Sequence, residues 1–346
     1  MIRITMFSAA ETVPGQGVGS AYRELVNLLT EKFPDKFALK FNSLAKTDIS
    51  HYHTINFGFF LNTFLPGRGV KVGYVHFIPE TLEGSIKLWW PFKKIFYWYM
   101  MTFYKRMDKI VVVNPVFIDK LVALGVKRDK ITFIPNFVSK KVFFPKPSTQ
   151  KKAIRQKLSL PENQFIILGV GQVQVRKGVL DFIQLAKANP NWTFVWVGGF
   201  SFGAITAGYD ELKKVVDNPP KNLIFPGIVG RDLMNDYYNA ADVFLLPSYT
   251  ELFPMSALEA FSTGTPTILR DLDLYQAIIA GYYLPAYDRQ AMQKQLEKLA
   301  TDDELKKKLS EQALAASEYY SAERVAKLWE DYYTSQVEAK DNNEVD

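Results

Sequence analysis

The chain has 346 residues, 48% of them hydrophobic and 23% charged, so it is long enough for about two globular domains and is neither disordered nor collagen-like. It contains no cysteine, which excludes disulfides, thiolate metal sites and thiol nucleophiles and favours a reducing compartment. The net charge is +6, but residues 1–150 hold 21 Lys and Arg against 10 Asp and Glu, so the basic charge lies in the first half. That half is expected to meet an anionic partner, either nucleic acid or a phospholipid surface.

Short apolar runs alternate with helical stretches along the whole chain. The first run is too short for a signal peptide and is predicted as a strand. This alternation is typical of parallel sheets joined by crossover helices, and hence of an α/β fold. The predicted strands are Ile2–Phe7, Lys71–His76, Lys109–Val113, Ile131–Ile134, Phe165–Val170, Thr193–Val197, Leu223–Phe225, Val243–Leu246 and Pro266–Leu269. The predicted helices cover residues 20–32, 115–124, 178–188, 208–216, 231–239, 254–262 and 303–335.

Residues 89–106, WWPFKKIFYWYMMTFYKR, combine nine aromatic and four cationic side chains with no acid. Apolar residues recur at helical spacing, but Trp98, Met101 and Tyr104 lie on the opposite face, and a helix that is apolar all round must be buried in protein or in lipid. The uncharged stretch Ile95–Tyr104 would be about 15 Å long, too short to span a hydrocarbon core of about 30 Å. The segment is therefore a core helix with basic ends or a helix lying in a membrane interface.

The membrane interpretation depends on side chains that favour the headgroup level. Trp and Tyr partition to the membrane–water interface, and Lys and Arg attract anionic lipid. Nucleic acid is not expected as a partner, because nothing nearby resembles an RNA-binding or DNA-binding module. The residues expected to contact the membrane are Trp89, Trp90, Lys93, Lys94, Trp98, Phe103, Lys105 and Arg106.

A basic stretch with several prolines marks the expected domain boundary near residue 148. We expect one α/β domain over residues 1–148 and a second over residues 149–319. Two doubly wound domains would leave a cleft between the carboxyl ends of their strands, where such sheets bind ligands.

The first candidate motif is VGQVQVRKG, residues 170–178, which leads from a predicted strand into a helix. Gly171 permits close backbone approach, and Arg176 and Lys177 at a helix start could hold a diphosphate. Basic residues are also common at loop ends without any function. The motif alone therefore leaves both interpretations open.

The second motif is SYTELFPMSALEAFSTGTP, residues 248–266, in which a loop with Glu251 precedes a helix that contains Glu259. Two carboxylates at a helix start could be a capping acid and an exposed one. They could instead accept hydrogen bonds from the hydroxyls of a ligand, because an ionised carboxylate suits a vicinal diol.

A Glu-x7-Glu pair after an apolar strand, with a Lys-Gly loop upstream, resembles the retaining glycosyltransferases of family 4, which have the GT-B fold of two Rossmann-like domains facing across a cleft. The resemblance covers nearly the whole chain. It implies that the helix over residues 320–346 crosses back to the first domain. The other segments that resemble the family are PGQGVGSAYREL (14–25), VHFIPE (75–80), ITFIPNFVSKKVF (131–143) and YYSAERVAKLWEDYY (319–333).

The resemblance also implies residue roles. Lys177 and Arg176 would hold the diphosphate of a nucleotide sugar, Glu259 the ribose hydroxyls and Glu251 hydroxyls of the transferred sugar. His76 would bond the sugar or the leaving oxygen, unless it is a core imidazole. Cations at the diphosphate would supply most of the catalysis, with no cofactor, metal or protein nucleophile. The remaining expected contacts are Gly17, Gly19, Gly171, Phe253, Pro254 and Met255.

Three features depart from the family or point elsewhere. Gln172 stands where the family often has Arg, and Pro254 stands where it usually has Gly. Asp271 and Asp273 are spaced like the metal-binding aspartates of a different glycosyltransferase fold, but we interpret them as loop residues, since a GT-B site needs no metal.

In this family the N-terminal domain binds the acceptor, which favours the membrane interpretation of residues 89–106. The stretch LRDLDLYQAIIAGYYL, residues 269–284, further resembles Gram-positive enzymes that add a second sugar to glucosyl-diacylglycerol, the anchor of lipoteichoic acid. We expect UDP-galactose or UDP-glucose as donor, a glycolipid acceptor, and peripheral attachment to an anionic membrane surface on its cytoplasmic face. A soluble or undecaprenyl-linked glycan acceptor is an alternative, as is a non-catalytic membrane-peripheral binding protein.

Overall fold

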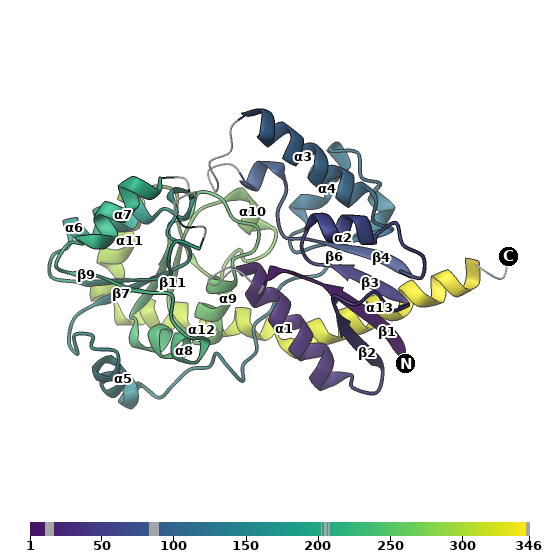
Figure 1. Ribbon diagram of the computed structural model, residues 1–346. Coiled ribbons are helices and arrows are strands. Elements are labelled where there is room, and N and C mark those ends of the chain that lie inside the picture. Colours follow the sequence, from purple (N-terminus) through teal and green to yellow (C-terminus); the bar gives the residue numbers. More distant parts are fainter. Residues whose placement is uncertain (11–16, 83–89, 202, 204–205, 207, 344–346) are drawn as a thin grey trace.

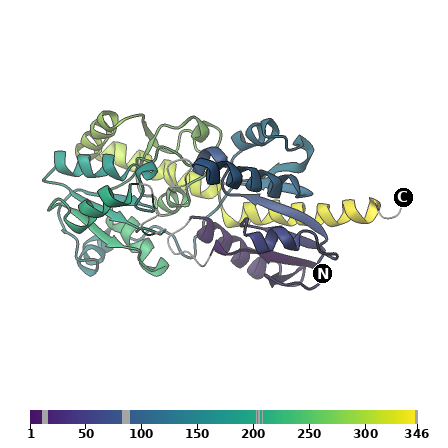
Figure 2. The same cartoon turned by 45° about the horizontal axis from the view of Figure 1, so that its top comes forward.

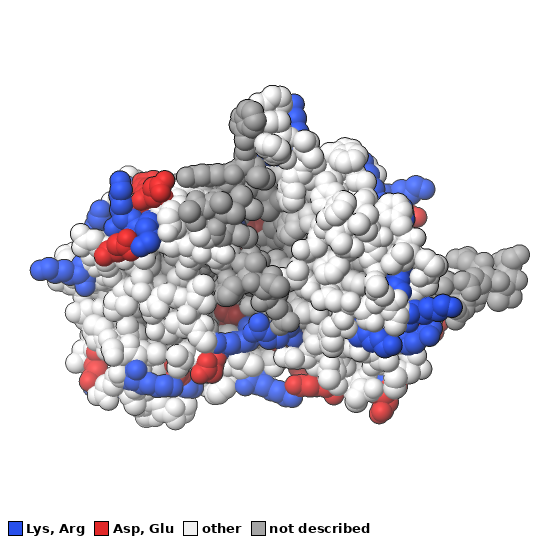
Figure 3. Space-filling model, viewed as in Figure 1, with Lys and Arg blue, Asp and Glu red and all other residues white. Residues whose placement is uncertain are grey.

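The computed structural model describes residues 1–10, 17–82, 90–201, 203, 206 and 208–343 (Figure 1). Two lobes lie side by side, each built on a six-stranded sheet in which every neighbouring pair of strands is parallel. Helices connect the strands in both lobes. The surface of the molecule is hollowed between the two lobes (Figure 3). This architecture confirms the α/β prediction.

The first lobe has the strand order β2-β1-β3-β4-β5-β6. Successive residues of a strand point to opposite faces, so Ile110 and Val112 of β5 pack with helices on one side and Val111 and Val113 pack on the other. The strands are β1 (Ile2–Phe7), β2 (Phe37–Phe41), β3 (Ile49–Tyr52), β4 (Val70–Val75), β5 (Lys109–Val112) and β6 (Ile131–Phe133). The helices are α1 (Gly17–Lys32), α2 (Phe57–Asn62), α3 (Trp90–Lys105) and α4 (Val116–Ala123).

The second lobe has the strand order β12-β11-β10-β7-β8-β9. One face packs on α6, α7 and α11, and the other on α8, α9 and α12. The strands are β7 (Ile166–Val170), β8 (Thr193–Val197), β9 (Leu223–Gly227), β10 (Val243–Leu246), β11 (Thr267–Arg270) and β12 (Leu284–Ala286). The helices are α5 (Lys151–Lys157), α6 (Val179–Ala188), α7 (Tyr209–Asp217), α8 (Arg231–Ala240), α9 (Met255–Ser262), α10 (Asp273–Gln276), α11 (Arg289–Thr301) and α12 (Asp303–Tyr319).

The single helix predicted over residues 303–335 is wrong, because two helices occupy this region. α12 ends at Tyr319, and α13 (Ala322–Asn343) begins after a break at Tyr320 and Ser321. The Tyr320 hydroxyl donates to the carbonyl of Ile278, and the Ser321 carbonyl accepts the amide of Val325 as the new helix starts. α12 packs on the second lobe and α13 on the first, so the end of the chain runs along both lobes (Figures 1 and 2).

The other predicted strands and helices are present, with ends that differ by a residue or a few. Strands β2, β3 and β12 were missed, as were helices α2, α5, α10 and α11. None of the helices in the described part of the chain is both long and apolar enough to cross a membrane.

Candidate active site

The loops after β7 and β10 are neighbours, although about 75 residues separate them in sequence. The chain runs outward from β7 through β8 to β9 and then returns to place β10 on the other side of β7. This reversal is the switch point at which doubly wound sheets bind ligands, beyond the carboxyl ends of the strands. The loop after β7 carries Lys177, and the loop after β10 carries Glu251.

Lys177 and Glu251 form a buried ion pair. The Lys177 Nζ donates to Oε1 of Glu251, and the two side chains are 13% and 7% exposed. Beside them, Arg176 Nη1 donates to the carbonyl of Thr250 at 3.3 Å, while the carbonyl of Arg176 accepts the amide of Tyr249 at 2.8 Å. The structure thus brings three of the predicted catalytic residues into one cluster.

Neighbouring charges keep Glu251 ionised. Burial raises its pKa, but Lys177 and Arg176 outweigh burial and hold the pKa of the carboxyl below its ordinary value. Burial lowers the pKa of Lys177, and the carboxylate opposes that shift. An ionised carboxylate and two cations at one site can bind hydroxyls and a phosphate together.

Gly178 allows the two loops to meet this closely. Its φ is +72°, and a Cβ built there would lie 2.1 Å from the carbonyl oxygen of Pro247, directly after β10. Only glycine tolerates both the backbone conformation and the approach. At the start of the same loop, a Cβ on Gly171 would lie 3.7 Å from Cδ of Lys177, so this predicted glycine also borders the pair.

Several buried polar atoms in the loop after β7 have no hydrogen-bond partner within the described part of the chain. They are Arg176 Nε, Gln172 Nε2, and both Nε2 and Oε1 of Gln174. Buried polar groups are nearly always paired in proteins, so this loop offers donors and an acceptor to a ligand. Sequence reasoning missed Gln174, because an uncharged loop residue gives no spacing or charge signal.

Glu259 lies in α9, and its Oε2 accepts a hydrogen bond from the Tyr238 hydroxyl at 2.8 Å. Burial raises the pKa of Glu259 to about 7, against the opposing effects of Arg231 and Tyr238. Arg231 Nη1 lies 3.8 Å from Oε1 of Glu259, and its Nη2 pairs with Glu24 of α1. Glu24 and Arg231, both missed from sequence, therefore link the predicted ribose carboxylate to the first lobe.

The amino ends of α1 and α9 approach each other across the two lobes. A Cβ on Gly17 would lie 3.9 Å from Cγ of Met255, and one on Gly19 would lie 3.0 Å from the carbonyl oxygen of Ala10. Helix starts carry unpaired amides and favour anions, so both starts suit a phosphate or a carboxylate. Residues 11–16 of the predicted glycine-rich turn lie outside the described residues.

Two asparagines of the first lobe hold the Glu251 loop. Asn114 Nδ2 donates to the carbonyls of Leu252 and Leu274, both at 3.0 Å, and Asn136 Nδ2 donates to the carbonyl of Phe253 at 3.2 Å. The Phe253 side chain is 4% exposed and its ring lies 5.0 Å from that of Tyr320. A contact of Phe253 with a nucleotide could therefore come only from its backbone. Pro254 directly precedes α9 with φ −70° instead of opening it.

The three histidines of the chain gather at the carboxyl edge of the first sheet. The ring centroids of His51 and His53 are 4.1 Å apart, and those of His76 and Tyr74 are 4.2 Å apart. Burial lowers the pKa of His76 to about 3, so its imidazole is neutral. His76 Nε2 has no hydrogen-bond partner among the described residues. His76 thus belongs to an aromatic cluster, and its contact with a sugar stays a prediction.

Helix α3 exposes part of the predicted membrane segment and buries the rest. Trp90 and Trp98 are 62% and 70% exposed, and Lys94 and Lys105 are also exposed. Phe103 is 1% exposed, so its predicted membrane contact is wrong: it packs against the sheet with Met100 and Tyr104. Lys93 is half-buried over the ring of Tyr97, and Trp89 lies outside the described residues.

Helix α2 and the turn after it extend this surface, which sequence reasoning missed. The ring centroids of Phe60 in α2 and Tyr99 in α3 are 5.5 Å apart. Arg106 Nε donates to Thr63 Oγ1 at 2.6 Å, and the guanidinium of Arg106 stacks on the ring of Phe64. These contacts hold Arg106 against the protein, so its predicted contact with lipid is not favoured. We call the exposed apolar residues of the two helices and of the turn after α2 the α2–α3 patch. They are Phe57, Leu61, Phe64, Leu65, Trp90, Phe92, Ile95 and Trp98.

No cluster of three or more His, Asp or Glu side chains among the described residues is arranged to hold a metal ion. Asp271 Oδ1 accepts hydrogen bonds from the Tyr283 hydroxyl at 3.1 Å and from Gln276 Nε2 at 3.4 Å. These contacts occupy Asp271 within its own loop.

Comparisons with known proteins define the class. A family model for group 1 glycosyl transferases matches residues 150–315, and a model for glycosyltransferase family 4 matches residues 12–141. The fold is similar to a sucrose-phosphate synthase from Thermosynechococcus elongatus, with a TM-score of 0.80, 16% identity, and coverage of 98% of this chain and 100% of that chain. It is also similar to Anabaena HepE in complex with UDP-glucose, with a TM-score of 0.76, 14% identity, and coverage of 97% and 100%. The chain belongs to the family 4 glycosyltransferases and has their GT-B fold.

One relative is similar along nearly the whole chain. The alpha-galactosylglucosyldiacylglycerol synthase of Streptococcus pneumoniae is 48% identical over 337 residues, covering 97% of this chain and 90% of that protein. A processive diacylglycerol alpha-glucosyltransferase of Acholeplasma laidlawii is 30% identical over 58% of this chain and 59% of its own length. The predicted resemblance to glycosyltransferases of diacylglycerol lipids is confirmed.

Proposed function

We propose that this glycosyltransferase moves a hexose from a UDP-sugar to glucosyl-diacylglycerol, with retention of configuration. The product would be a diglycosyl-diacylglycerol of the kind that anchors lipoteichoic acid. The observation that carries the proposal is the buried Lys177–Glu251 pair at the switch point of the second sheet. The 48% identity to a galactosylglucosyldiacylglycerol synthase supports the acceptor class and favours galactose over glucose as the transferred sugar.

The donor would lie beyond β7 and β10. Lys177 and Arg176 would take the diphosphate, the free side-chain atoms of Gln174 would take further donor hydroxyls, and Glu251 would take hydroxyls of the sugar. Glu259 would bind the ribose from α9. The UDP-glucose complex of the structurally similar HepE supports a uridine nucleotide.

The chemistry needs charge stabilisation more than a nucleophile. The acceptor oxygen forms a bond to the anomeric carbon as the bond from that carbon to the diphosphate oxygen breaks, and the acceptor proton passes to the leaving diphosphate. Positive charge develops on the sugar and negative charge on the diphosphate, so fixed cations lower the barrier because they interact more strongly with the transition state. Lys177 and Arg176 would supply those cations.

The acceptor would reach the cleft from a membrane surface. The α2–α3 patch groups eight exposed apolar side chains on the lobe that carries the basic half of the sequence. An exposed patch of this kind with lysines beside it suits an anionic bilayer interface. Peripheral attachment would bring the headgroup of glucosyl-diacylglycerol to the first lobe.

The test is transfer from UDP-galactose and from UDP-glucose to diacylglycerol, glucosyl-diacylglycerol and an undecaprenyl-linked glycan, with products identified by mass. We expect one hexose to be added to glucosyl-diacylglycerol, and activity to be lost in Lys177→Ala. Transfer only to the undecaprenyl-linked glycan would replace the proposed acceptor. Binding of the UDP-sugar without transfer or hydrolysis would instead identify a binding protein.

A further inference from the structure

A second cavity lies at the opposite end of the second sheet from the donor cleft. It has a volume of about 300 Å³ and is bordered by the start of α5, the ends of α8 and α9, and the first half of α12. Asp242, on its wall, directly precedes β10, whereas the Glu251 loop follows that strand. The four residues of β10 span about 13 Å, and the cavity and the Glu251 loop lie at opposite ends of that strand.

The cavity wall carries far more positive than negative charge. Its charged residues are four lysines and one aspartate, namely Lys146, Lys151, Lys306, Lys307 and Asp242. This excess is notable in the half of the chain that is acidic as a whole. Ser148, Thr263, Thr265 and Ser310 also line the cavity, although the hydroxyls of Thr263 and Thr265 donate to the backbone carbonyls of Ala260 and Tyr238.

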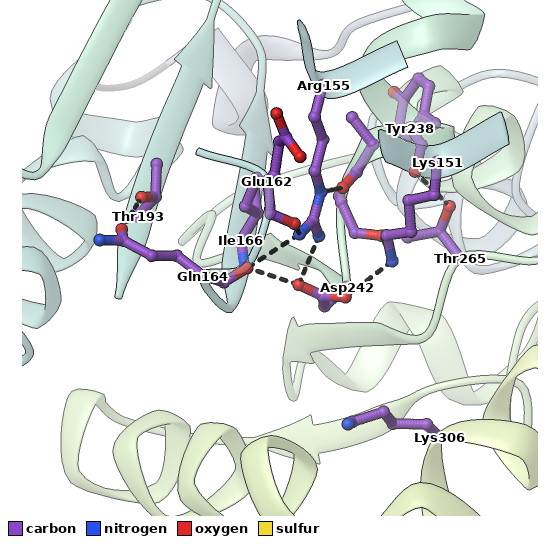
Figure 4. Close-up of polar contacts among 12 residues, drawn as sticks. Lys151, Arg155, Glu162, Gln164, Ile166, Thr193, Tyr238, Asp242, Thr265 and Lys306 are labelled. Carbon is purple, nitrogen blue, oxygen red and sulfur yellow. Dashed lines mark hydrogen bonds and ion pairs between the residues drawn. The ribbon is translucent and has the colours of Figure 1, made fainter. Parts of the chain in front are cut away.

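The single carboxylate of the wall is already fully used. Asp242 Oδ1 accepts from Lys151 Nζ at 2.7 Å, and Oδ2 accepts from Arg155 Nη2 at 2.8 Å and from the amide of Ile166 at 2.7 Å (Figure 4). Two cations therefore share this carboxylate. The charge of Lys151 and Arg155 together exceeds that of Asp242. Lys146, on the same wall, pairs with Asp236, which also pairs with Lys157, so this second carboxylate is likewise shared by two cations.

The lysines of α12 complete the positive wall from the other side. Figure 4 shows Lys306 across from the Asp242 cluster, and its Nζ pairs with Asp303 at 2.8 Å. Lys307 is exposed, and its side chain makes no hydrogen bond or ion pair within the described residues. Burial lowers the pKa of Lys151, and the nearby charges of Arg155 and Lys306 lower it further, while Asp242 opposes the shift. An anion in the cavity would offset this repulsion.

We propose that this cavity is a binding site for a small phosphate-bearing anion, separate from the nucleotide-sugar site. The wall offers ammonium donors and the hydroxyls of Ser148 and Ser310, and no arginine is among its lining residues. Ammonium and hydroxyl donors without a guanidinium fork suit the tetrahedral phosphate group better than a carboxylate. The volume lies at the lower end of the range for ligand pockets, as expected for a phosphate ester of a small polyol.

The phosphate can come from a soluble molecule or from a lipid headgroup. In Figure 1, α5 and α12 lie on the lower side of the molecule and α3 lies at its upper edge. A membrane bound through the α2–α3 patch would therefore leave the cavity facing solution. This arrangement favours a soluble phosphate ester as the ligand.

The proposal is tested by calorimetric titration of the full chain with inorganic phosphate and with glycerol 3-phosphate. UDP is kept saturating to occupy the donor cleft, and the ionic strength is held constant with sodium chloride. We expect saturable binding with a Kd on the order of 1 mM or below. The Lys306→Gln/Lys307→Gln variant should bind at least about tenfold more weakly, since two charged donors are lost.

Lys308→Gln is the matched control, because Lys308 is the next exposed lysine of α12 and does not line the cavity. It should bind as the parent chain does. A parallel experiment measures binding to phosphatidylglycerol vesicles. Weaker vesicle binding by the Lys306→Gln/Lys307→Gln variant, but not by Lys308→Gln, would support the site with a lipid headgroup as the source of the phosphate. The absence of binding in both arms, or an equal loss in Lys308→Gln, would overturn the proposal.

Discussion

The buried pair of Lys177 and Glu251 allows structural and chemical roles to be separated by substitution. Lys177→Met removes the cation and keeps a side chain of similar length. Glu251 would then be buried with Arg176 as its nearby cation. Glu251→Gln removes the carboxylate and leaves two adjacent cations, Lys177 and Arg176, in a site where the lysine is only 13% exposed.

The size of each effect follows from burial. Breaking a buried ion pair by removing one partner costs about 3–5 kcal/mol of unfolding free energy. The loss of unfolding free energy in Lys177→Met should be near the lower value, because Arg176 still compensates the charge of Glu251. The loss in Glu251→Gln should be near the upper value. The double variant Lys177→Met/Glu251→Gln should recover most of the loss, since neutral residues of similar volume carry no uncompensated charge. Its glycosyl transfer should nevertheless be abolished.

Urea denaturation of all four proteins, followed by circular dichroism, measures the stability, and transfer from a UDP-sugar measures the activity. The stabilisation by the pair should be complete above pH about 4.5 and decline as the pH falls below it, because the folded state depresses the Glu251 pKa. Single variants that each cost less than about 1 kcal/mol would contradict a buried pair. A double variant that is stable and still transfers sugar would refute the site.

Three further predictions address the membrane surface, the loop geometry and the ribose carboxylate. Trp98→Ala, which removes a 70% exposed indole from the α2–α3 patch, should weaken binding to phosphatidylglycerol vesicles about tenfold; Tyr287→Ala, at a 74% exposed aromatic residue of the second lobe, should leave it unchanged. Gly178→Ala should lower the unfolding free energy by about 3 kcal/mol in urea denaturation, whereas Gly58→Ala, where a Cβ meets nothing within 4 Å, should not. The Glu259 pKa is about 7, and its ionised form would accept hydrogen bonds from the ribose hydroxyls. Calorimetry should therefore show an affinity for the UDP-sugar that is about tenfold weaker at pH 6 than at pH 8. A Glu259→Gln variant with the same pH dependence would argue against the assignment of Glu259 to the ribose.

Most of the fold could be predicted because long apolar strands alternate with amphipathic helices. The missed strands lack that signal: β2 is an edge strand with exposed residues, β3 carries Ser50 and His51, and β12 has only three residues, one of them Pro285. Their pairing is decided by neighbours that are distant in sequence. The break between α12 and α13 depends on a contact of Tyr320 with Ile278, which no local pattern shows.

The candidate site could be predicted where charge and spacing mark it, as at Lys177 and Glu251. The contacts that hold the site together are long-range and could not be predicted from local sequence. Asn114 donates to the carbonyl of Leu252, 138 residues away, and Glu24 of the first lobe pairs with Arg231 of the second. Amphipathic periodicity also could not decide which face of α3 is buried. That choice depends on contacts with strands that are distant in sequence, such as that of Phe103 with Tyr52 of β3. These contacts place Phe103 inside and leave Trp98 outside.

The amides of Asn114 and Asn136 have a mechanical consequence. From the first lobe they donate to the carbonyls of Leu252 and Phe253, which directly follow Glu251. The loop that would hold the donor sugar is therefore anchored to the lobe that would receive the acceptor. A motion that moves the Glu251 loop away from the first lobe must break the hydrogen bonds to Leu252 and Phe253. Opening of the space between the lobes would therefore also move the loop that would hold the donor sugar.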